Sequence, residues 1–130
     1  MISIYSKFQS DLKVSPNFKV KELLCDCCNT ALVHADLPLV LEALRAILGR
    51  PIRINSGYRC PKHNLEVGGA LRSTHLGGMA ADCSWHGFEL NDIVKTAIRG
   101  IPQVHGIGWG KDFVHVDVDA SRIHQNEWTY

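Results

Sequence analysis

The chain has 130 residues, which suits a single domain with a sizeable hydrophobic core. Its composition is that of a globular protein, 45% hydrophobic and 21% charged, and its formal net charge is only +1. This small charge gives no indication of a protein that binds nucleic acid or an anionic membrane, and no apolar run reaches the ~18 residues of a membrane span. We expect one domain over residues 1–130, with an N-terminal arm over 1–17 and a C-terminal tail over 120–130.

The N-terminal segment is polar and mixed, without the apolar core of a secretory signal peptide. We therefore expect that the protein stays inside the cell, leaves it by a route other than a cleaved signal, or has lost its leader. No strong periodicity appears before Ser15-Pro16, which marks a loop. After this loop, the apolar side chains of residues 18–24 predict a short helix or turn that covers the core.

Helical spacing is clearest over residues 36–48, where apolar side chains recur every three or four positions. Asp36 is expected to be the N-cap of this helix, and Gly49 is expected to end it. Two further helical patterns, over 61–67 and 89–99, also end at glycines. Alternation of apolar and polar residues predicts four strands, over 52–56, 80–84, 106–110 and 113–119.

The chain has five cysteines, an odd number that cannot all pair within one chain. Without a signal peptide, reduced thiols are the default. Cys25 and Cys28 have the two-residue gap of a metal-binding pair, but Cys27 lies between them and no second such pair follows. We therefore favour free or locally oxidised thiols over a structural zinc site in this segment. At Cys60 and Cys83 we expect small buried thiols.

Residues 73–82, with the sequence STHLGGMAAD, carry an imidazole and a carboxylate seven positions apart. Both His75 and Asp82 are of types that bind zinc, and the glycine pair between them allows the backbone to turn sharply. We predict a loop that carries His75 and runs into a strand that carries Asp82. On this pattern alone, His75 is as readily a surface loop residue as a metal ligand.

The strand predicted over 113–119 offers a third ligand. Alternation places His115 and Asp117 on one face and the valines between them on the other. Two histidines and one carboxylate leave a fourth tetrahedral position open, as in catalytic zinc sites, where bound water has a pKa of about 7. Asp112 is the candidate proton acceptor, provided that residues 110–112 form a loop or bulge. The alternative is that these are solvated residues of an edge strand and its turn.

Four segments together resemble a single family. They are residues 56–64 (SGYRCPKHN), 67–70 (VGGA), 73–82 (STHLGGMAAD) and 112–117 (DFVHVD). Over residues 18–118 the chain is similar to the zinc D-Ala-D-Ala peptidases, which cleave bacterial cell-wall peptides. That family includes D-Ala-D-Ala carboxypeptidases and dipeptidases, and phage endolysins that cut the L-alanyl-D-glutamate bond.

The resemblance implies an α+β fold of the hedgehog/DD-peptidase type, with a small, mainly antiparallel sheet, flanking helices and zinc in an open groove. It implies one Zn²⁺ per chain, held by His75, Asp82 and His115. It also implies that Asp112 is the acidic general base, and that Arg59 binds substrate or stabilises the oxyanion.

Four further residues are assigned supporting or substrate-binding roles in this groove. Ser73 is expected to hydrogen-bond a ligand or the substrate, and Asp117 is expected to orient a histidine. His105 is expected to line the groove, and Trp109 to pack beside the site.

The activity that the resemblance implies is zinc-dependent hydrolysis of amide bonds in peptidoglycan peptides, as a carboxypeptidase or an endopeptidase. We expect a monomer that acts on the bacterial wall, in the periplasm or outside the cell, and that depends on a holin or a virion for delivery if it is phage-derived. The alternatives are a non-catalytic wall-binding or phage-structural domain with the same fold, and a cytosolic dipeptidase with the same chemistry.

Overall fold

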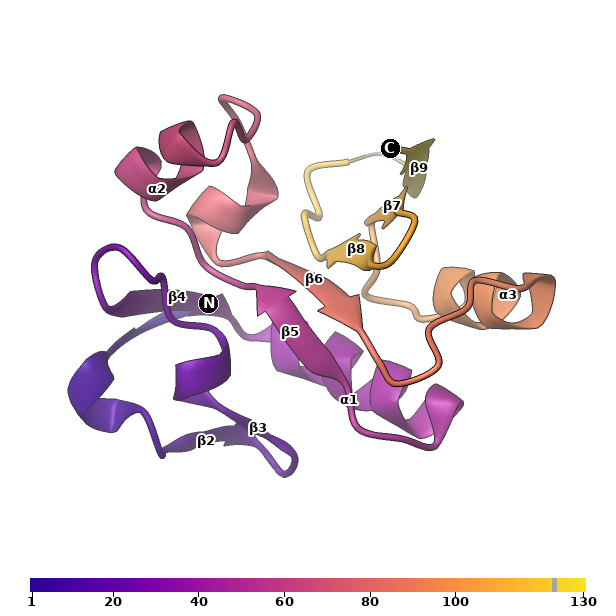
Figure 1. The fold of residues 1–130 in the computed structure, drawn as a ribbon, viewed down its shortest axis with the longest axis horizontal. Helices are drawn as coiled ribbons and strands as arrows, with labels where there is room; N and C mark the ends of the chain where they lie inside the picture. Colours follow the sequence, from indigo (N-terminus) through magenta and orange to yellow (C-terminus); the bar gives the residue numbers. More distant parts are fainter. Residues whose placement is uncertain (123) are drawn as a thin grey trace.

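The computed structural model describes residues 1–122 and 124–130, and it has the expected α+β fold. Its central sheet contains β5 (Arg53–Ser56), β6 (Ala80–Ser84), β7 (Gly106–Trp109), β8 (Val114–Asp117) and β9 (Asn126–Thr129). The strand order is β5-β6-β8-β7-β9 (Figure 1). Neighbouring strands are antiparallel, except that β9 runs parallel to β7.

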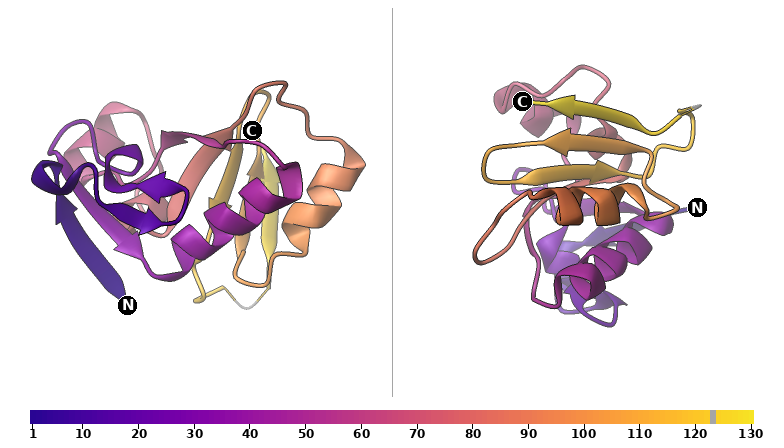
Figure 2. Two further views of the ribbon diagram at one scale, coloured as in Figure 1. Left: turned by 90° about the horizontal axis from the view of Figure 1, so that it is seen from below. Right: turned by 90° about the vertical axis from the view of Figure 1, so that its right-hand side faces the viewer.

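Helices lie beside this sheet and complete the core. The α-helices of the described residues are α1 (Asp36–Leu48), α2 (Pro61–Glu66) and α3 (Asp92–Arg99). Figure 2 shows α1 and α3 next to each other on one side of the sheet, and they are in contact. The core between these layers includes Leu41 and Leu44 of α1, Ile98 of α3 and Val114 and Val116 of β8, all fully buried. The opposite face of β8 is thereby left for polar side chains.

The N-terminal third forms two small antiparallel sheets that the sequence did not predict. One pairs β1 (Ile2–Ser6) with β4 (Thr30–His34), and the other pairs β2 (Lys13–Ser15) with β3 (Phe18–Lys19). The apolar face of β1 is largely exposed, so backbone pairing rather than burial holds this strand. The segment expected to be an N-terminal arm therefore contains paired strands.

The short helix or turn expected over residues 18–24 is confirmed. A 3₁₀ turn, η2 (Val20–Glu22), lies between β3 and β4. Phe18, Val20 and Leu23 are almost fully buried, so this segment packs against the core. A second 3₁₀ turn, η1 (Lys7–Gln9), follows β1 and is exposed.

Three features of these elements differ from the predictions. Ala35, not Asp36, is the N-cap of α1, and Asp36 is instead the acidic residue of its first turn. Helix α3 begins three residues later than predicted, because the Asn91 side chain accepts a hydrogen bond from the Val94 N–H at 2.9 Å and caps it there. The strand predicted over 113–119 is also not the last one, because β9 follows it in the expected C-terminal tail.

Gly49 ends α1 as predicted, with a left-handed φ of 64°. Strand β6 has the predicted bounds, and β5, β7 and β8 lie within the predicted ranges. In the part of the chain that the structure describes, no helix is long and apolar enough to cross a membrane.

Candidate metal centre

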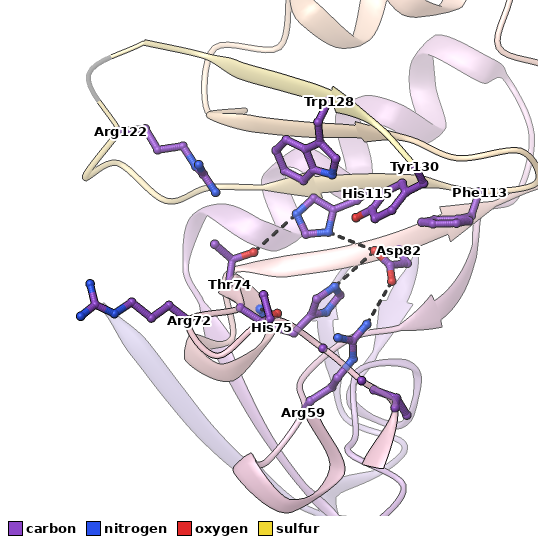
Figure 3. A pocket seen from close by; sticks show the side chains of 15 residues that line it. Arg59, Arg72, Thr74, His75, Asp82, Phe113, His115, Arg122, Trp128 and Tyr130 are labelled. Atoms are coloured by element: carbon purple, nitrogen blue, oxygen red, sulfur yellow. Dashed lines mark hydrogen bonds and ion pairs between the residues drawn. The ribbon is translucent and has the colours of Figure 1, made fainter. Parts of the chain in front are cut away.

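The three predicted metal ligands come from three elements and meet at one point. Asp82 lies on β6 and His115 on β8, and the antiparallel register makes them direct partners. His75 lies on a 3₁₀ turn, η3 (Thr74–Gly77), that leads into β6. One donor atom from each residue lies within 4.8 Å of the other two. Figure 3 shows both imidazoles directed toward the Asp82 carboxylate.

The position of His75 depends on the local sequence around η3. The Ser73 hydroxyl accepts a hydrogen bond from the His75 N–H at 3.2 Å and so begins the turn. Gly78 ends it with a φ of 69°, and a Cβ atom at this position would lie only 2.2 Å from the Leu32 carbonyl oxygen. Only glycine therefore allows η3 to pack this closely against β4.

The hydrogen bonds of His75 define which of its nitrogens carries a proton. Nδ1 lies 2.7 Å from the Gly57 carbonyl oxygen, which can only accept, so Nδ1 is protonated. In the neutral ring, the lone pair of Nε2 then faces Asp82 Oδ1, 3.2 Å away. Two lone pairs at this distance repel each other unless a cation or a proton lies between them.

His115 has the same arrangement as His75, but with the roles of its two ring nitrogens exchanged. Its Nε2 lies 2.9 Å from Asp117 Oδ2, which accepts a hydrogen bond, and its Nδ1 faces Asp82 Oδ1 at 3.1 Å. Two imidazole lone pairs therefore converge on one carboxylate oxygen. Donor atoms of tetrahedral zinc lie about 3.4 Å apart for bonds of about 2.1 Å, which is close to these separations. The three side chains thus fit a zinc ion, and the ring nitrogens that point away from it are held by second partners.

Burial strengthens the electrostatic coupling among these groups. His75 and His115 are 3% and 5% exposed. When a proton instead of a cation lies between these atoms, the imidazoles hydrogen-bond to Asp82. Burial alone would raise the pKa of Asp82, but these bonds with His115 and His75 outweigh it and hold that pKa well below its ordinary value. Burial likewise opposes the charge of His115, yet its bonds to Asp117 and Asp82 raise its pKa. The centre therefore carries a fixed negative charge on Asp82, which favours a bound cation.

Arg59 lies beside the candidate metal ligands. Its Nη2 is 3.3 Å from Asp82 Oδ2, the oxygen that does not face the histidines. Its Nε donates to Ser56 Oγ at 3.1 Å, and its Nη1 is 3.3 Å from Asn64 Oδ1. These contacts hold the guanidinium at the edge of the centre, where it can bind an anionic group of a ligand.

A pocket of about 460 Å³ opens in front of the three residues. Arg59, Arg72 and Arg122 line it, whereas Asp82 is the one carboxylate among its described lining residues. Ser73 also lines the pocket, so its position agrees with the predicted substrate-binding role, although its hydroxyl already caps η3. The pocket is therefore rich in positive charge around one acidic candidate ligand.

Three aromatic residues, two of them in the C-terminal segment, form one wall of this pocket, and the sequence did not predict them. Trp128 lies with its ring centroid 5.2 Å from that of His115, and Phe113 and Tyr130 pack together at 5.0 Å. All three line the pocket. The available signal was the two-residue spacing of Trp128 and Tyr130, which places both on one face of a strand.

Asp117 has the supporting position predicted for it. It is fully buried at the base of the centre, and its Oδ2 atom contacts both His115 Nε2 and, at 3.4 Å, Arg122 Nη2. A Cβ atom on Gly106 would lie 2.2 Å from this carboxylate oxygen, so the neighbouring strand leaves space for Asp117 only because residue 106 is glycine.

The structure does not place three other predicted site residues in the pocket. Asp112 is exposed in the turn between β7 and β8, which a hydrogen bond from the Gly110 N–H to the Phe113 carbonyl oxygen closes. His105 is half-buried, and only its backbone bonds are found, to Asp117 and Asn126. Neither lines the pocket among the residues described.

Trp109 lies on the other face of the sheet. Alternation along β7 and β9 directs it toward α3, where Lys95 and Arg99 lie over its ring and its Nε1–H donates to Glu127 at 2.9 Å. It therefore packs under α3 instead of beside the metal-binding residues, and it too is outside the described pocket lining.

Residues 16–117 match the family model described as Peptidase M15. The matched region covers most of the chain and includes all three candidate metal ligands. Among curated proteins, none matches closely enough to count as a relative.

Proposed function

The chain belongs to the Peptidase M15 family of zinc D-Ala-D-Ala metallopeptidases, and we propose that it hydrolyses amide bonds in the peptides of bacterial peptidoglycan. The observation that carries this proposal is the convergence of His75 Nε2 and His115 Nδ1 on Asp82 Oδ1 at 3.2 and 3.1 Å. We assign these three residues as ligands of one zinc ion. Bound zinc would polarise the scissile carbonyl and lower the pKa of a water molecule to about 7.

The residues around the zinc ligands have separate tasks. Arg59 binds a carboxylate of the substrate or stabilises the oxyanion, because its guanidinium stays charged and lies beside Asp82. Asp112, three residues before His115, accepts the proton of the water and returns it to the leaving amine. Its turn lies next to Phe113, which lines the pocket, so this assignment requires the exposed carboxylate to turn toward bound substrate.

The lining of the pocket supports an anionic peptide as the substrate. Arg59, Arg72 and Arg122 surround it, and the aromatic wall of Phe113, Trp128 and Tyr130 offers apolar contact. Wall peptides carry free carboxylates on alanine and glutamate residues, which arginine binds through paired hydrogen bonds. Both a terminal D-Ala-D-Ala bond and an L-alanyl-D-glutamate bond have such a carboxylate nearby. We propose that the enzyme acts where this substrate lies, in the periplasm or outside the cell.

One observation favours a second candidate function. Because Asp112 is exposed and outside the described pocket lining, the carboxylates that the described residues place at the centre are Asp82, a proposed ligand, and Asp117, which is bonded to His115. A domain that binds wall peptides through its arginines and zinc, without hydrolysing them, is the alternative that this position supports.

Digestion of purified peptidoglycan separates the two functions. Zinc-loaded protein is incubated with sacculi, and the soluble products are analysed by mass spectrometry. A carboxypeptidase shortens stem peptides by one alanine, whereas an endopeptidase releases peptides with a new amino terminus. His115→Ala, which lacks one ligand, is the matched control. If zinc-loaded wild type sediments with sacculi and releases no peptide, the binding function is correct and the hydrolytic one is wrong.

A further inference from the structure

A second group of metal-binding side chains lies outside the peptidase centre. Cys25 and Cys28 lie in the loop between η2 and β4, and Cys60 is the N-cap residue of α2. One sulfur from each lies within 4.8 Å of the other two, although the loop and the helix are more than 30 residues apart in sequence. Cys25 is buried, Cys28 is exposed and Cys60 is half-buried, so the group lies at the surface with one side against the core.

The backbone around these cysteines is arranged as a tight turn. The Asn29 N–H donates to the Cys25 carbonyl oxygen at 3.0 Å, and the Cys25 N–H donates to the Thr30 carbonyl oxygen at 2.8 Å. Asn29 has a φ of 55°, the left-handed conformation that asparagine tolerates better than most residues. This turn brings Cys25 and Cys28 to the same side, with the two-residue spacing of zinc-binding cysteine pairs.

Backbone N–H groups point at two of the sulfur atoms. The Cys60 N–H lies 3.5 Å from Cys25 Sγ, and the His63 N–H lies 3.4 Å from Cys60 Sγ. Such donors stabilise a thiolate. The pKa of Cys60 is lowered accordingly, first by the His63 N–H and further by the neighbouring thiols.

The fourth cysteine of the region, Cys27, is exposed and directly precedes Cys28 in the same loop.

We propose that Cys25, Cys28 and Cys60 bind a second zinc ion, with Cys27 as its fourth ligand. Sulfur atoms around tetrahedral zinc lie about 3.8 Å apart for bonds of about 2.3 Å, within the limit that these three sulfurs satisfy. Soft thiolates select zinc over magnesium or calcium. The sequence disfavoured this site because no second cysteine pair follows the first, but the fold supplies Cys60 from a distant turn.

The site has a structural role next to the peptidase centre. Cys60 directly follows Arg59, and the Tyr58 N–H donates to the Leu23 carbonyl oxygen at 3.1 Å. Gly57 packs so closely on Leu23 that a Cβ atom would lie 2.9 Å from the Leu23 Cα. The zinc ion joins the 25–28 loop to this same segment and so fixes the turn that presents Arg59 to Asp82.

Metal analysis of the purified, reduced chain tests the proposal. Wild type is expected to bind two zinc ions per chain, and Cys28→Ser and Cys60→Ser one each, while His115→Ala loses the other ion and keeps this one. Cys83→Ala is the control, because Cys83 is buried in the core away from the cluster, and it is expected to keep both. Zinc content unchanged in Cys28→Ser and Cys60→Ser would overturn the proposal.

Cobalt substitution identifies the ligands without relying on variants of the cluster. Cobalt-loaded His115→Ala is expected to show thiolate-to-cobalt charge-transfer absorption, because its remaining ion has sulfur ligands, and absence of this band would overturn the site. Cys27→Ser is expected to weaken cobalt binding at least tenfold, and unchanged affinity would overturn the assignment of Cys27. Titration of chelated, unfolded wild type should find all five thiols. Three thiols would show a disulfide in place of the metal.

Discussion

Asp117 Oδ2 lies 2.9 Å from His115 Nε2, and the two residues are neighbours on the same face of β8. Their bond fixes the proton of His115 on Nε2 and directs the lone pair of Nδ1 at Asp82. Burial alone would raise the pKa of Asp117, but its hydrogen bond with His115 outweighs burial and keeps that pKa below its ordinary value. The carboxylate is therefore ionised, and it stabilises the imidazole in the orientation that a metal requires.

We expect Asp117→Asn to weaken zinc binding at the peptidase centre by about 10- to 100-fold, because the uncharged amide no longer fixes the His115 tautomer. Competition with a chromophoric chelator measures this affinity. Asp119→Asn is the control, since Asp119 lies two residues further along and bonds to Ser121 instead of a histidine. An equal loss in both variants would contradict the proposed role of Asp117.

We expect His75→Ala and His115→Ala each to bind one zinc ion fewer than wild type and to lose hydrolytic activity, because each removes one of three ligands. Metal content after dialysis and peptide release from sacculi measure the two effects. His105→Ala is the matched control, because His105 does not line the described part of the pocket, and it should keep its zinc. Full zinc content in both ligand variants would make the assignment wrong.

Asp112→Asn separates the two candidate functions. As the proton acceptor, Asp112 is expected to contribute about 10²- to 10⁴-fold to kcat, so the variant should keep its zinc and lose this factor. Steady-state kinetics on a synthetic wall peptide provide the measurement. Lys111→Ala changes the neighbouring exposed residue of the same turn and should leave kcat unaltered. Unaltered kcat in Asp112→Asn would instead mean that another group takes the proton.

Local patterns predicted which side chains the fold brings together around Asp82, because each pattern has a direct geometric consequence. The glycine pair before Asp82 predicted a turn into β6, and alternation placed His115 and Asp117 on one face of β8. The α+β fold was predicted through resemblance to a family, and the Peptidase M15 match confirms that family.

Features that depend on distant parts of the chain were not predicted. The pairing of β1 with β4 rests on backbone bonds between segments almost 30 residues apart, and the exposed face of β1 leaves no burial pattern. Strand β9 pairs in parallel with β7, which no local signal reveals, so the aromatic wall was missed with it. The position of Trp109 was also predicted wrongly, because no local signal shows which face of β7 is covered by α3.

The aromatic wall predicts an effect on substrate binding. Trp128→Ala removes the ring that lies over His115 and lines the pocket, so KM should rise by about 2- to 10-fold with a smaller change in kcat. Trp128→Phe keeps an aromatic ring and should retain most of the affinity. Kinetics on the same wall peptide compare the two variants. An effect on kcat alone would assign Trp128 to positioning His115 instead of binding substrate.

Glu127 attaches the C-terminal strand β9 to the rest of the protein. Its pKa therefore affects how the stability of the fold depends on pH. Its carboxylate accepts hydrogen bonds from Arg99 at 2.8 and 2.9 Å and from Trp109 at 2.9 Å. The bond to Arg99, and then the bond to Trp109, lower the pKa of Glu127 below its ordinary value. Because the folded pKa is the lower one, the charged carboxylate stabilises the folded state.

This stabilisation is complete above the unfolded pKa of about 4.3 and is lost as the pH falls through the lower folded value. Glu127→Gln should therefore lower the Tm at pH 7, and its difference from wild type should shrink as the pH falls from 5 toward 2. Circular dichroism melts across this range measure it. Glu89→Gln, at an exposed site, should melt like wild type at every pH. A difference for Glu127→Gln that stays constant with pH would mean that the ionised carboxylate does not hold β9 in place.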